Sequence, residues 1–427
     1  MGKKTDMTRR AFLRRTAALV AVPAIIPSAA LGQEGRAAPS ERIVLGGIGM
    51  GGRGGGDLNW MMGQPDVQAV AICDVRRDRR ERAKAMVDER YGNKDCAAYR
   101  DLRELLARSD IDAVLIATSD RWHTLASVMA MKAGKDVYCE KPCAVTVAQS
   151  RILADTARQY GRVFQAGTQR RSEGPFVFTV LLARTGKLGK LSQIMVHIWG
   201  RLFAGHVWLQ PQPEPPKEEL DWDLYLGPVP WRPYNRGYVD NRMGDSDLWA
   251  GGLHEWGAHT FDLCQWGNNS DRTSPLEYEF PNNDTGEGLV ARYANGVELV
   301  TTAGHFKGSC GVRFEGDGGW AQCSDGQQPE AEPKSLLDEQ QKLLDEYVQQ
   351  TGRALDHVRD FFDCVKSRRL AAANAEIARR AHTICHVGSI CMQLRRNVKW
   401  DPVKEEFIGD EEANRMRSRA MRAPWVL

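Results

Sequence analysis

Residues 41–165 show short apolar runs separated by stretches of helical length. The runs are rich in Val, Ile, Leu and Ala and are largely apolar on both faces, which is typical of strands buried inside a parallel sheet. They occupy residues 42–48, 67–74, 111–118 and 136–140. Strands that alternate with helices in this way predict an α/β domain with a Rossmann-type, doubly wound parallel sheet.

Residues 166–427 follow a different pattern. Runs of strand composition lie at 189–199, 277–280, 288–293 and 297–302. The Asn295-Gly296 pair between the last two runs is a strong hairpin signal. Apolar residues at helical spacing follow, from Leu355 to Val365 and from Ile377 to Gly388. The pattern predicts an α+β domain with a large, mostly antiparallel open sheet and C-terminal helices.

A Pro-rich stretch from Pro211 to Pro233 interrupts this half, and it is long enough to be a loop laid over a site. Seven of the twelve tryptophans fall near it, at positions 199, 208, 222, 231, 249, 256 and 266. Indole faces stack well on the CH surfaces of sugars, which favours a carbohydrate substrate, although about half of these residues are expected in the core.

The first 32 residues differ from the rest of the chain. Arg9 and Arg10 stand before an apolar run from Ala17 to Ile26, and small residues follow. This is the pattern of a twin-arginine export signal, and the alternative is an amphipathic first helix. The run is too short, and too interrupted by proline, to span a membrane. We therefore expect a periplasmic protein that is exported folded and has no stable membrane association after cleavage.

The formal charge and the spacing of the cysteines argue against two kinds of partner, nucleic acid and metal ions. Cleavage after Ala30 would remove six basic residues and one acidic residue, so the formal charge would fall from +3 to −2. A near-neutral protein has no global field to attract nucleic acid. The ten cysteines are scattered without a Cys-x-x-Cys pair, so we expect buried thiols and no metal site.

A glycine-rich turn follows the first predicted strand. Gly49, Gly51 and Gly54 form a G-x-G-x-x-G motif between a strand and a helix, where glycines permit a tight turn and close approach to a pyrophosphate. Gly47, Gly49 and Gly52 form a second G-x-G-x-x-G motif that overlaps the first. We prefer the first motif because it lets the strand run to Ile48.

The second predicted strand ends on Asp74, 20 residues after Gly54. A carboxylate at this place accepts hydrogen bonds from the adenosine ribose of a dinucleotide. Asp74 therefore predicts NAD as the cofactor. Arg76 and Arg77, which follow at once, leave NADP open.

The last predicted strand of the first half ends on Glu140, Lys141 and Pro142. The carboxyl ends of parallel strands open on the crevice where such sheets hold ligands, and proline cannot continue the strand ladder. Lys141 is therefore expected to project into the site. For an isolated Glu-Lys-Pro a surface lysine would be the better interpretation.

A second group of chemical residues lies in the helix predicted after Gly251-Gly252. Glu255, His259 and Asp262 fall on one stripe of that helix. Oxidation of an alcohol needs a base for the hydroxyl proton, and a neutral histidine titrates in the right range. We expect His259 to be this base, Lys141 to bind the same oxygen and Glu255 to orient His259 or relay its proton; a buried histidine that only packs is the alternative.

Several motifs resemble one family in their order and spacing. They are Gly-x-Gly-Gly-Arg-Gly at 49–54, Ala-Thr-x-Asp-x-Trp-His at 117–123, Ala-Gly-Lys-Asp-Val-Tyr-Cys-Glu-Lys-Pro at 133–142, Gln-Ala-Gly-Thr-Gln-Arg-Arg-Ser at 165–172, the stretches 220–228 and 251–262, and the tail with Arg422-Ala-Pro-Trp425. The chain thereby resembles the Gfo/Idh/MocA oxidoreductases (glucose-fructose oxidoreductase, inositol dehydrogenase) over nearly its whole length after residue 40.

The resemblance implies a Rossmann domain at 41–165 and a substrate and oligomerisation domain at 166–427, whose sheet makes the subunit contacts of a homodimer or homotetramer. It implies these cofactor-binding residues: Gly49, Gly51, Gly52, Arg53, Gly54, Asp74, Thr118, Trp122, His123, Glu140, Lys141 and Gln169. The catalytic residues it implies are Lys141, His259 and Glu255. The family's usual Asp-x-x-x-His appears here with Glu255 in the first place.

Three functions follow from these observations. The first is an NAD(P)-dependent oxidoreductase acting on a hydroxyl of a sugar, sugar derivative or cyclitol. The second is an NAD-dependent glycoside hydrolase that oxidises the sugar ring transiently. The third is a non-catalytic sugar or nucleotide binder, against which Lys141 and His259 count. Net formation of NADH would distinguish the first from the second.

The export signal can be tested by replacing its paired arginines. Arg9→Lys together with Arg10→Lys should leave folding unchanged and stop export, because both residues precede the folded domains. Fractionation of cells expressing either form measures the result. Equal recovery of both proteins from the periplasm would show that the interpretation of the first 32 residues is wrong.

Overall fold

The computed structural model describes residues 37–198, 205–240, 244–302 and 304–427. The predicted export signal and Trp199 lie outside the described residues. The chain divides into Met1–Arg42, in which a short 3-10 helix η2 (Pro39–Glu41) is described, and a second unit, Ile43–Leu427, which holds every other element.

A parallel sheet forms the first layer of the second unit, in the strand order β3-β2-β1-β4-β5-β6. Its strands are β1 (Ile43–Ile48), β2 (Val67–Cys73), β3 (Ala97–Tyr99), β4 (Ala113–Ile116), β5 (Asp136–Cys139) and β6 (Phe164–Ala166). The strand order reverses between β1 and β4, so the crevice typical of such sheets opens at their carboxyl ends. The predicted Rossmann sheet is confirmed, and β3 and β6 are additional strands too short for a pattern to reveal.

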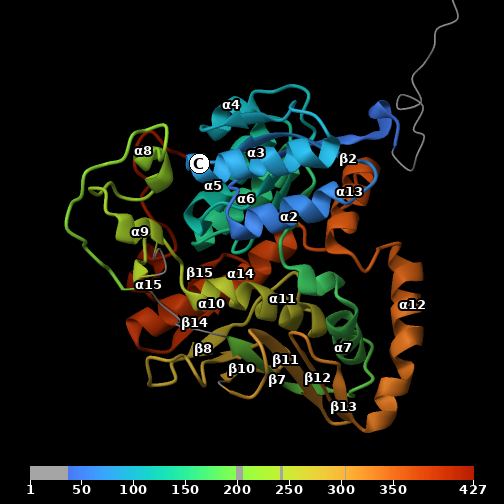
Figure 1. The fold of residues 1–427 in the computed structure, drawn as a ribbon. Coiled ribbons are helices and arrows are strands. Elements are labelled where there is room, and N and C mark those ends of the chain that lie inside the picture. The colour runs from blue at the N-terminus through green and yellow to red at the C-terminus, as the bar shows by residue number, and fades with distance from the viewer. Residues whose placement is uncertain (1–36, 199–204, 241–243, 303) are drawn as a thin grey trace, which may run out of the picture. The chain divides into compact units, whose positions relative to one another are not determined.

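Helices cover both faces of this sheet (Figure 1). One buried cluster joins the sheet to α2 (Gly52–Met62), α3 (Arg77–Tyr91) and α13 (His357–Ser367), and another joins it to α4 (Leu102–Leu106), α5 (Asp120–Lys132) and α6 (Val147–Gln159). Helix α13 comes from the second half of the chain, yet Val358, Phe361 and Phe362 pack on the parallel sheet. The two halves are therefore interleaved, because α13 buries its apolar face on the sheet of the first half.

The second sheet has nine strands in the order β13-β12-β11-β7-β10-β9-β8-β14-β15. They are β7 (Leu191–Ile198), β8 (Glu277–Glu279), β9 (Val290–Arg292), β10 (Glu298–Thr302), β11 (Cys310–Gly316), β12 (Gly319–Ser324), β13 (Glu330–Glu332), β14 (Val398–Asp401) and β15 (Glu406–Phe407). Only β7 and β10 pair in parallel. The predicted large, mostly antiparallel sheet is confirmed.

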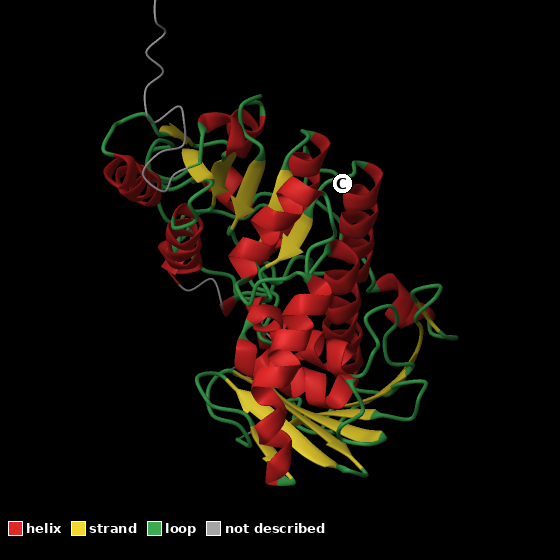
Figure 2. Cartoon of the chain, turned by 90° about the vertical axis from the view of Figure 1, so that its right-hand side faces the viewer, coloured by secondary structure: helices red, strands yellow, loops and turns green. Residues whose placement is uncertain are grey.

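Helices α7 (Gly174–Arg184), α11 (Gly257–Gly267) and α14 (Ala375–Leu394) share a buried core with the second sheet. Figure 2 shows that helices lie on the face of this sheet that is turned toward the parallel sheet. The remaining elements are η3 (Gln169–Ser172), α8 (Trp222–Leu226), α9 (Arg236–Asp240), α10 (Gly252–Glu255), η5 (Lys334–Glu339), α12 (Gln340–Thr351) and α15 (Glu411–Arg415).

The ten cysteines are all buried free thiols, which confirms the prediction made from their spacing. Within the described ranges, no helix has the length and apolar character needed to cross a bilayer. Also within those ranges, no group of three or more His, Cys, Asp or Glu side chains is arranged to hold a metal ion.

Candidate active site

The turn between β1 and α2 admits no side chain at two of its glycines. Gly49 has φ +85°, and a Cβ there would lie 2.5 Å from the backbone nitrogen of Thr118 at the end of β4. A Cβ on Gly54 would lie 2.1 Å from the carbonyl oxygen of Gly49. Helix α2 begins at Gly52, so its first N–H groups, which have no partner within the helix, face the crevice. Such a helix start binds anions.

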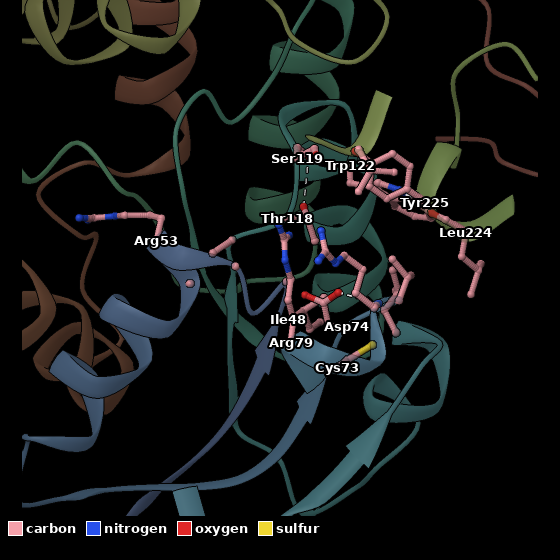
Figure 3. A pocket seen from close by; sticks show the side chains of 18 of the residues that line it. Ile48, Arg53, Cys73, Asp74, Arg79, Thr118, Ser119, Trp122, Leu224 and Tyr225 are labelled. Atoms are coloured by element: carbon pink, nitrogen blue, oxygen red, sulfur yellow. Dashed lines mark hydrogen bonds between the residues drawn. The ribbon is translucent and has the colours of Figure 1, made fainter. Parts of the chain in front are cut away.

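A cavity of about 350 Å³ opens at this turn (Figure 3). Gly49, Asp74, Thr118 and Trp122 line it from the parallel sheet. The opposite wall consists of Leu224 and Tyr225 from the Pro-rich stretch and of Val239 and Asp240 from α9, which follows it. The predicted loop over a site is thus a folded segment that closes one side of the cavity, and the volume is in the range of ligand pockets.

Asp74 is only 7% exposed and binds the backbone on both sides. One carboxylate oxygen accepts from the N–H of Met50 at 2.7 Å and the other from the N–H of Arg76 at 2.9 Å. Burial raises the pKa of Asp74, and the two N–H groups and Arg79 oppose that rise. Each carboxylate oxygen has a second lone pair, so Asp74 can still accept a hydroxyl hydrogen.

The arginines beside Asp74 are not all available to a ligand. Arg76 is paired with Asp78 at 2.7 Å, and Arg77 with Glu81 at 3.1 Å. Arg79, which the sequence analysis did not single out, lines the cavity as Arg76 does, and Figure 3 shows Arg79 beside Asp74.

An ionic cluster joins the start of α2 to the end of β5. Arg53 extends away from Asp74 in Figure 3 and contacts Asp57 at 2.9 Å and Glu140 at 3.1 Å. A Cβ on Gly167 would lie 2.4 Å from the Glu140 carboxylate, so this glycine leaves room for it. Burial, with the nearby Glu140 carboxylate, raises the pKa of Asp57 to about 8, although Arg53 opposes the rise. The cluster fixes the residue that precedes Lys141.

Lys141 lies where the two halves of the chain meet, and its side chain is 13% exposed. Its Nζ is 3.8 Å from Oε1 of Glu255 and 5.0 Å from the centre of the Trp256 ring. The indole N–H of Trp249 donates to the other oxygen of Glu255 at 2.6 Å. Burial lowers the pKa of Lys141, against the charges of Glu140 and Glu255.

The prediction that one continuous helix carries Glu255, His259 and Asp262 is wrong. Helix α10 ends at Glu255 and α11 begins at Gly257. A Cβ on Gly257 would lie 2.8 Å from the Phe261 ring and 3.4 Å from the sulfur of Cys385 on α14, so the chain approaches both closely at the interruption. Glu255 consequently contacts Lys141, while His259 lies inside α11.

His259 is 2% exposed, and its Nε2 accepts a hydrogen bond from Nη1 of Arg170 at 3.2 Å. A guanidinium only donates, so the proton of the neutral ring is assigned to Nδ1, which has no hydrogen-bond partner among the described residues. Burial, followed by the charges of Arg170, Lys141 and Arg53, holds the pKa of His259 well below its usual value. The lone pair expected to accept the substrate proton is therefore occupied.

Arg170 was missed as a separate residue, although it lies in the stretch 165–172. Its guanidinium is bound to Asp325 at 2.8 Å, and the hydroxyl of Ser309 donates to the same carboxylate at 2.7 Å. The Gln169 amide lies between the carbonyl oxygen of Gly167 (2.6 Å) and Nη1 of Arg170 (3.1 Å). Arg170 is thus oriented by its neighbour Gln169 and by Asp325, which lies far along the chain in the second sheet domain.

Two predicted residues point away from the cavity and from Lys141. Asp262 forms a buried ion pair with Arg171 at 2.6 Å, and burial raises its pKa to about 6 against that partner. His123, expected to bind cofactor, is buried with Nδ1 2.8 Å from the carbonyl oxygen of Pro142 and Nε2 3.2 Å from that of Thr118. The ring of His123, on the first turn of α5, braces the turn after Lys141 through these two contacts, and its predicted role in binding cofactor stays a prediction.

Two family models match the chain. One, described as an oxidoreductase family with an NAD-binding Rossmann fold, matches residues 42–168. The other, the C-terminal alpha/beta domain of the same Gfo/Idh/MocA oxidoreductase family, matches residues 181–427.

Three curated relatives are similar to part of this chain. An inositol 2-dehydrogenase of Salmonella typhimurium is 33% identical over 132 residues, which are 31% of this chain and 37% of that protein. A glycosyl hydrolase family 109 protein of Saccharopolyspora erythraea is 36% identical over 126 residues, 29% of this chain and 27% of that protein. A D-glucoside 3-dehydrogenase of Escherichia coli is 38% identical over 98 residues, 23% and 26% of the two chains. The chain thus matches about a third or less of each relative's length.

Solved structures share the fold of most of this chain. GenD2 from gentamicin A biosynthesis, in complex with NAD, has a TM-score of 0.57 at 18% identity, over 86% of this chain and 98% of that one. An aldose-aldose oxidoreductase from Caulobacter crescentus has a TM-score of 0.55 at 16% identity, over 84% and 99%.

The Asp57 cluster predicts a change in how stability depends on pH. The raised pKa means that the folded protein binds this proton more tightly than the unfolded chain does. The resulting stabilisation is complete below the unfolded pKa, near about 4, and is lost as the pH rises through about 8. Asp57→Asn cannot titrate, so the free energy of unfolding should change less between these pH values.

Chemical denaturation at a series of pH values measures this effect. Asp110→Asn is the matched control, because Asp110 is exposed and its pKa is lowered by Arg108. A pH profile of Asp57→Asn that follows the wild type throughout would contradict the argument.

The cavity predicts that NAD binds more tightly than NADP. A 2′-phosphate at the ribose position would approach the Asp74 carboxylate, and two like charges at 4 Å cost roughly 1 to 4 kcal/mol, or about tenfold or more in affinity. Asp74→Asn should bring the affinities for NAD and NADP closer together, whereas Asp155→Asn, on α6 and paired with Arg158, should not. Titration of the apoprotein with both nucleotides measures it, and tighter binding of NADP by the wild type would defeat the prediction.

Proposed function

Because the chain belongs to the Gfo/Idh/MocA family of oxidoreductases, we propose that it transfers a hydride between NAD and a hydroxyl group of a sugar, sugar derivative or cyclitol. The observation that carries the proposal is the contact of Lys141 with Glu255. This contact lies at the carboxyl edge of the parallel sheet whose glycine turn forms the cavity.

The described residues fit NAD. Gly49 and Gly54 have no Cβ, so the backbone of the turn can pack closely at both positions. The N–H groups at the start of α2 would hold the pyrophosphate. Asp74 would accept a hydrogen bond from the adenosine ribose, and Thr118 and Trp122 would form the wall between the two ends of the cofactor. Bound NAD would supply the hydride acceptor.

Lys141 would donate a hydrogen bond to the substrate oxygen and stabilise the negative charge that develops there. Burial in this part of the site strengthens that interaction. Trp256 provides an aromatic surface beside the ammonium for the CH face of a sugar ring.

The geometry supports Glu255 as the proton acceptor more directly than His259. Glu255 contacts Lys141 and is held in place by Trp249, so the hydroxyl proton can pass to its carboxylate. His259 contacts Arg170 through the nitrogen that a base would need. We therefore give His259 the role of positioning Arg170 toward the substrate.

A second candidate function is cleavage of a glycosidic bond through transient oxidation of the sugar. The likeness to glycosyl hydrolase family 109 proteins favours it, although the match to one of them covers only 29% of this chain. The non-catalytic binder is less well supported, because a buried Lys141 paired with Glu255 is costly to maintain without a reaction. The periplasmic location and a homodimer or homotetramer remain proposals that rest on the sequence.

Three variants test the assignment on a panel of sugars and cyclitols. Lys141→Met should raise the barrier by roughly 3 kcal/mol, the order for a lost oxyanion donor, and leave binding of NAD nearly unchanged. Glu255→Gln should lower kcat by roughly 100-fold or more, because the amide cannot accept the hydroxyl proton. His259→Ala should mainly raise KM, because it loosens Arg170.

Glu287→Gln is the control, since Glu287 is an exposed glutamate far along the chain from the site. If His259→Ala lowers kcat by roughly 100-fold while Glu255→Gln leaves kcat unchanged, the base is His259 and our assignment is wrong. Activity of Lys141→Met equal to the wild type would contradict the site as a whole.

A further inference from the structure

A second cavity, of about 560 Å³, lies between α10, α14 and the C-terminal tail (residues 410–427). Helix α10 contributes His254 to its wall, and α15 in the tail contributes Arg415 (Figure 1). Of the described residues that line it, none lines the cofactor cavity, and none is Lys141 or Glu255. The second cavity is therefore separate, and its volume is in the range of ligand pockets.

Two arginines of the tail line this cavity without a carboxylate partner. Among the described residues, Arg415 forms no ion pair, and Arg419 donates only to the carbonyl oxygen of Ser246, at 3.4 Å. A guanidinium carries five N–H donors, so both side chains keep donors that a ligand can use.

The other charged side chain of the described lining is Asp247. It forms an ion pair with the buried guanidinium of Arg232, which also contacts Asp245 at 2.8 Å. The lining thus holds two guanidinium groups against one carboxylate that already has a partner. Guanidinium groups bind carboxylates and phosphates strongly, so the cavity favours an anion.

The backbone around Arg415 is fixed by contacts with two other parts of the fold. Asn414 accepts from the N–H of Phe407 at 2.8 Å and donates to its carbonyl oxygen at 2.9 Å. The N–H of Ala148, on α6, donates to the carbonyl oxygen of Arg417 at 3.1 Å. Because these bonds flank Arg415, little backbone freedom is left to lose when a ligand binds.

Two buried histidines lie on the inner side of the cavity. Nε2 of His254 is 3.0 Å from Nδ1 of His386, and Nε2 of His386 is 2.9 Å from the hydroxyl of Ser150. Burial, followed by the nearby His382 and the charge of Arg419, lowers the pKa of His254 to about 3. The ring of His254 is therefore neutral near pH 7, and the positive charge of the cavity comes from the arginines.

The rest of the lining suits a hydroxylated ring. The neutral side chains there that form hydrogen bonds are Thr146, Ser246, Ser389, Gln393 and Ser418. Trp249 adds an aromatic surface of the kind that packs on the CH face of a sugar. Its indole N–H donates to Glu255 at 2.6 Å, so the cavity adjoins the residue that holds the proposed base.

We propose that this cavity is a second ligand site, which binds a sugar or sugar derivative that carries a carboxylate or phosphate group. The oxyanion would accept hydrogen bonds from the guanidinium groups of Arg415 and Arg419. Ser389 and Gln393 would bind hydroxyl groups of the ring, which would lie against Trp249. The inference goes beyond the proposed function, because no step of the hydride transfer passes through this cavity.

Isothermal titration calorimetry of the full chain without NAD measures this binding. The probes are D-glucuronate for a carboxylate and D-glucose 6-phosphate for a phosphate, and D-glucose is the neutral control. We expect at least one anionic sugar to bind about tenfold or more tightly than glucose, since hydrogen bonds to charged groups contribute on that order. The tighter of the two identifies the anionic group.

Two variants locate the binding. Arg419→Gln should weaken it by about tenfold or more, and so should Arg415→Gln. Both arginines are exposed, so neither substitution removes a buried side chain. Arg158→Gln is the matched control, because Arg158 is an exposed arginine on α6 that does not line the cavity. Lys141→Met should bind the anionic sugar as the wild type does.

Four results would overturn the proposal. They are equal affinity for glucose and both anionic sugars, equal affinity for inorganic phosphate and glucose 6-phosphate, unchanged binding in both Arg415→Gln and Arg419→Gln, and binding that Lys141→Met abolishes while Arg419→Gln keeps it. The last result would place the ligand beside Lys141. All four leave the proposed function intact, because the titrations involve neither NAD nor turnover.

Discussion

The close approach of Gly49 to Thr118 is the constraint on which the site depends. A Cβ at Gly49 would lie 2.5 Å from the Thr118 nitrogen, and one at Gly54 would lie 2.1 Å from Gly49 O. Because β1, β4 and α2 meet here without intervening side chains, the first N–H groups of α2 remain open to the cavity. The same packing sets Asp74, at the end of β2, beside the turn through its bond to Met50.

The proposed hydride transfer takes place where the second half of the chain contacts the carboxyl edge of the parallel sheet. Lys141 follows β5, and Glu255 arrives at the end of α10, so the ammonium and the carboxylate meet only in the folded protein. Residues 216–240, the strap, close the other end of the cavity, and Arg422 of the C-terminal tail donates to the carbonyl oxygen of Gly227 within the strap. The glycine turn, the Lys141–Glu255 contact and the segment that closes the cavity thus all lie at one edge of the parallel sheet.

The sequence predicts those parts of the site that depend on local structure. Gly49 and Asp74 are set by the strand-turn-helix pattern, and both lie where the pattern places them. The interruption before Gly257 could not be predicted, because it depends on the close approach of Cys385 from a distant helix. The bond between Arg170 and His259 joins residues 89 positions apart, and no periodicity carries such information. The motif at 117–123 predicts a histidine at position 123, but the direction of its ring depends on packing and on the contact with the carbonyl oxygen of Pro142.

We propose that the glycine turn, Asp74 and Lys141 all contact the same bound dinucleotide. A crystal structure of the full chain with NAD tests it most directly. We expect the pyrophosphate at the start of α2, the adenosine ribose within hydrogen-bond distance of Asp74 and the nicotinamide at the Lys141 end. A dinucleotide that lies in the opposite direction, or outside the cavity beneath the strap, would contradict the account.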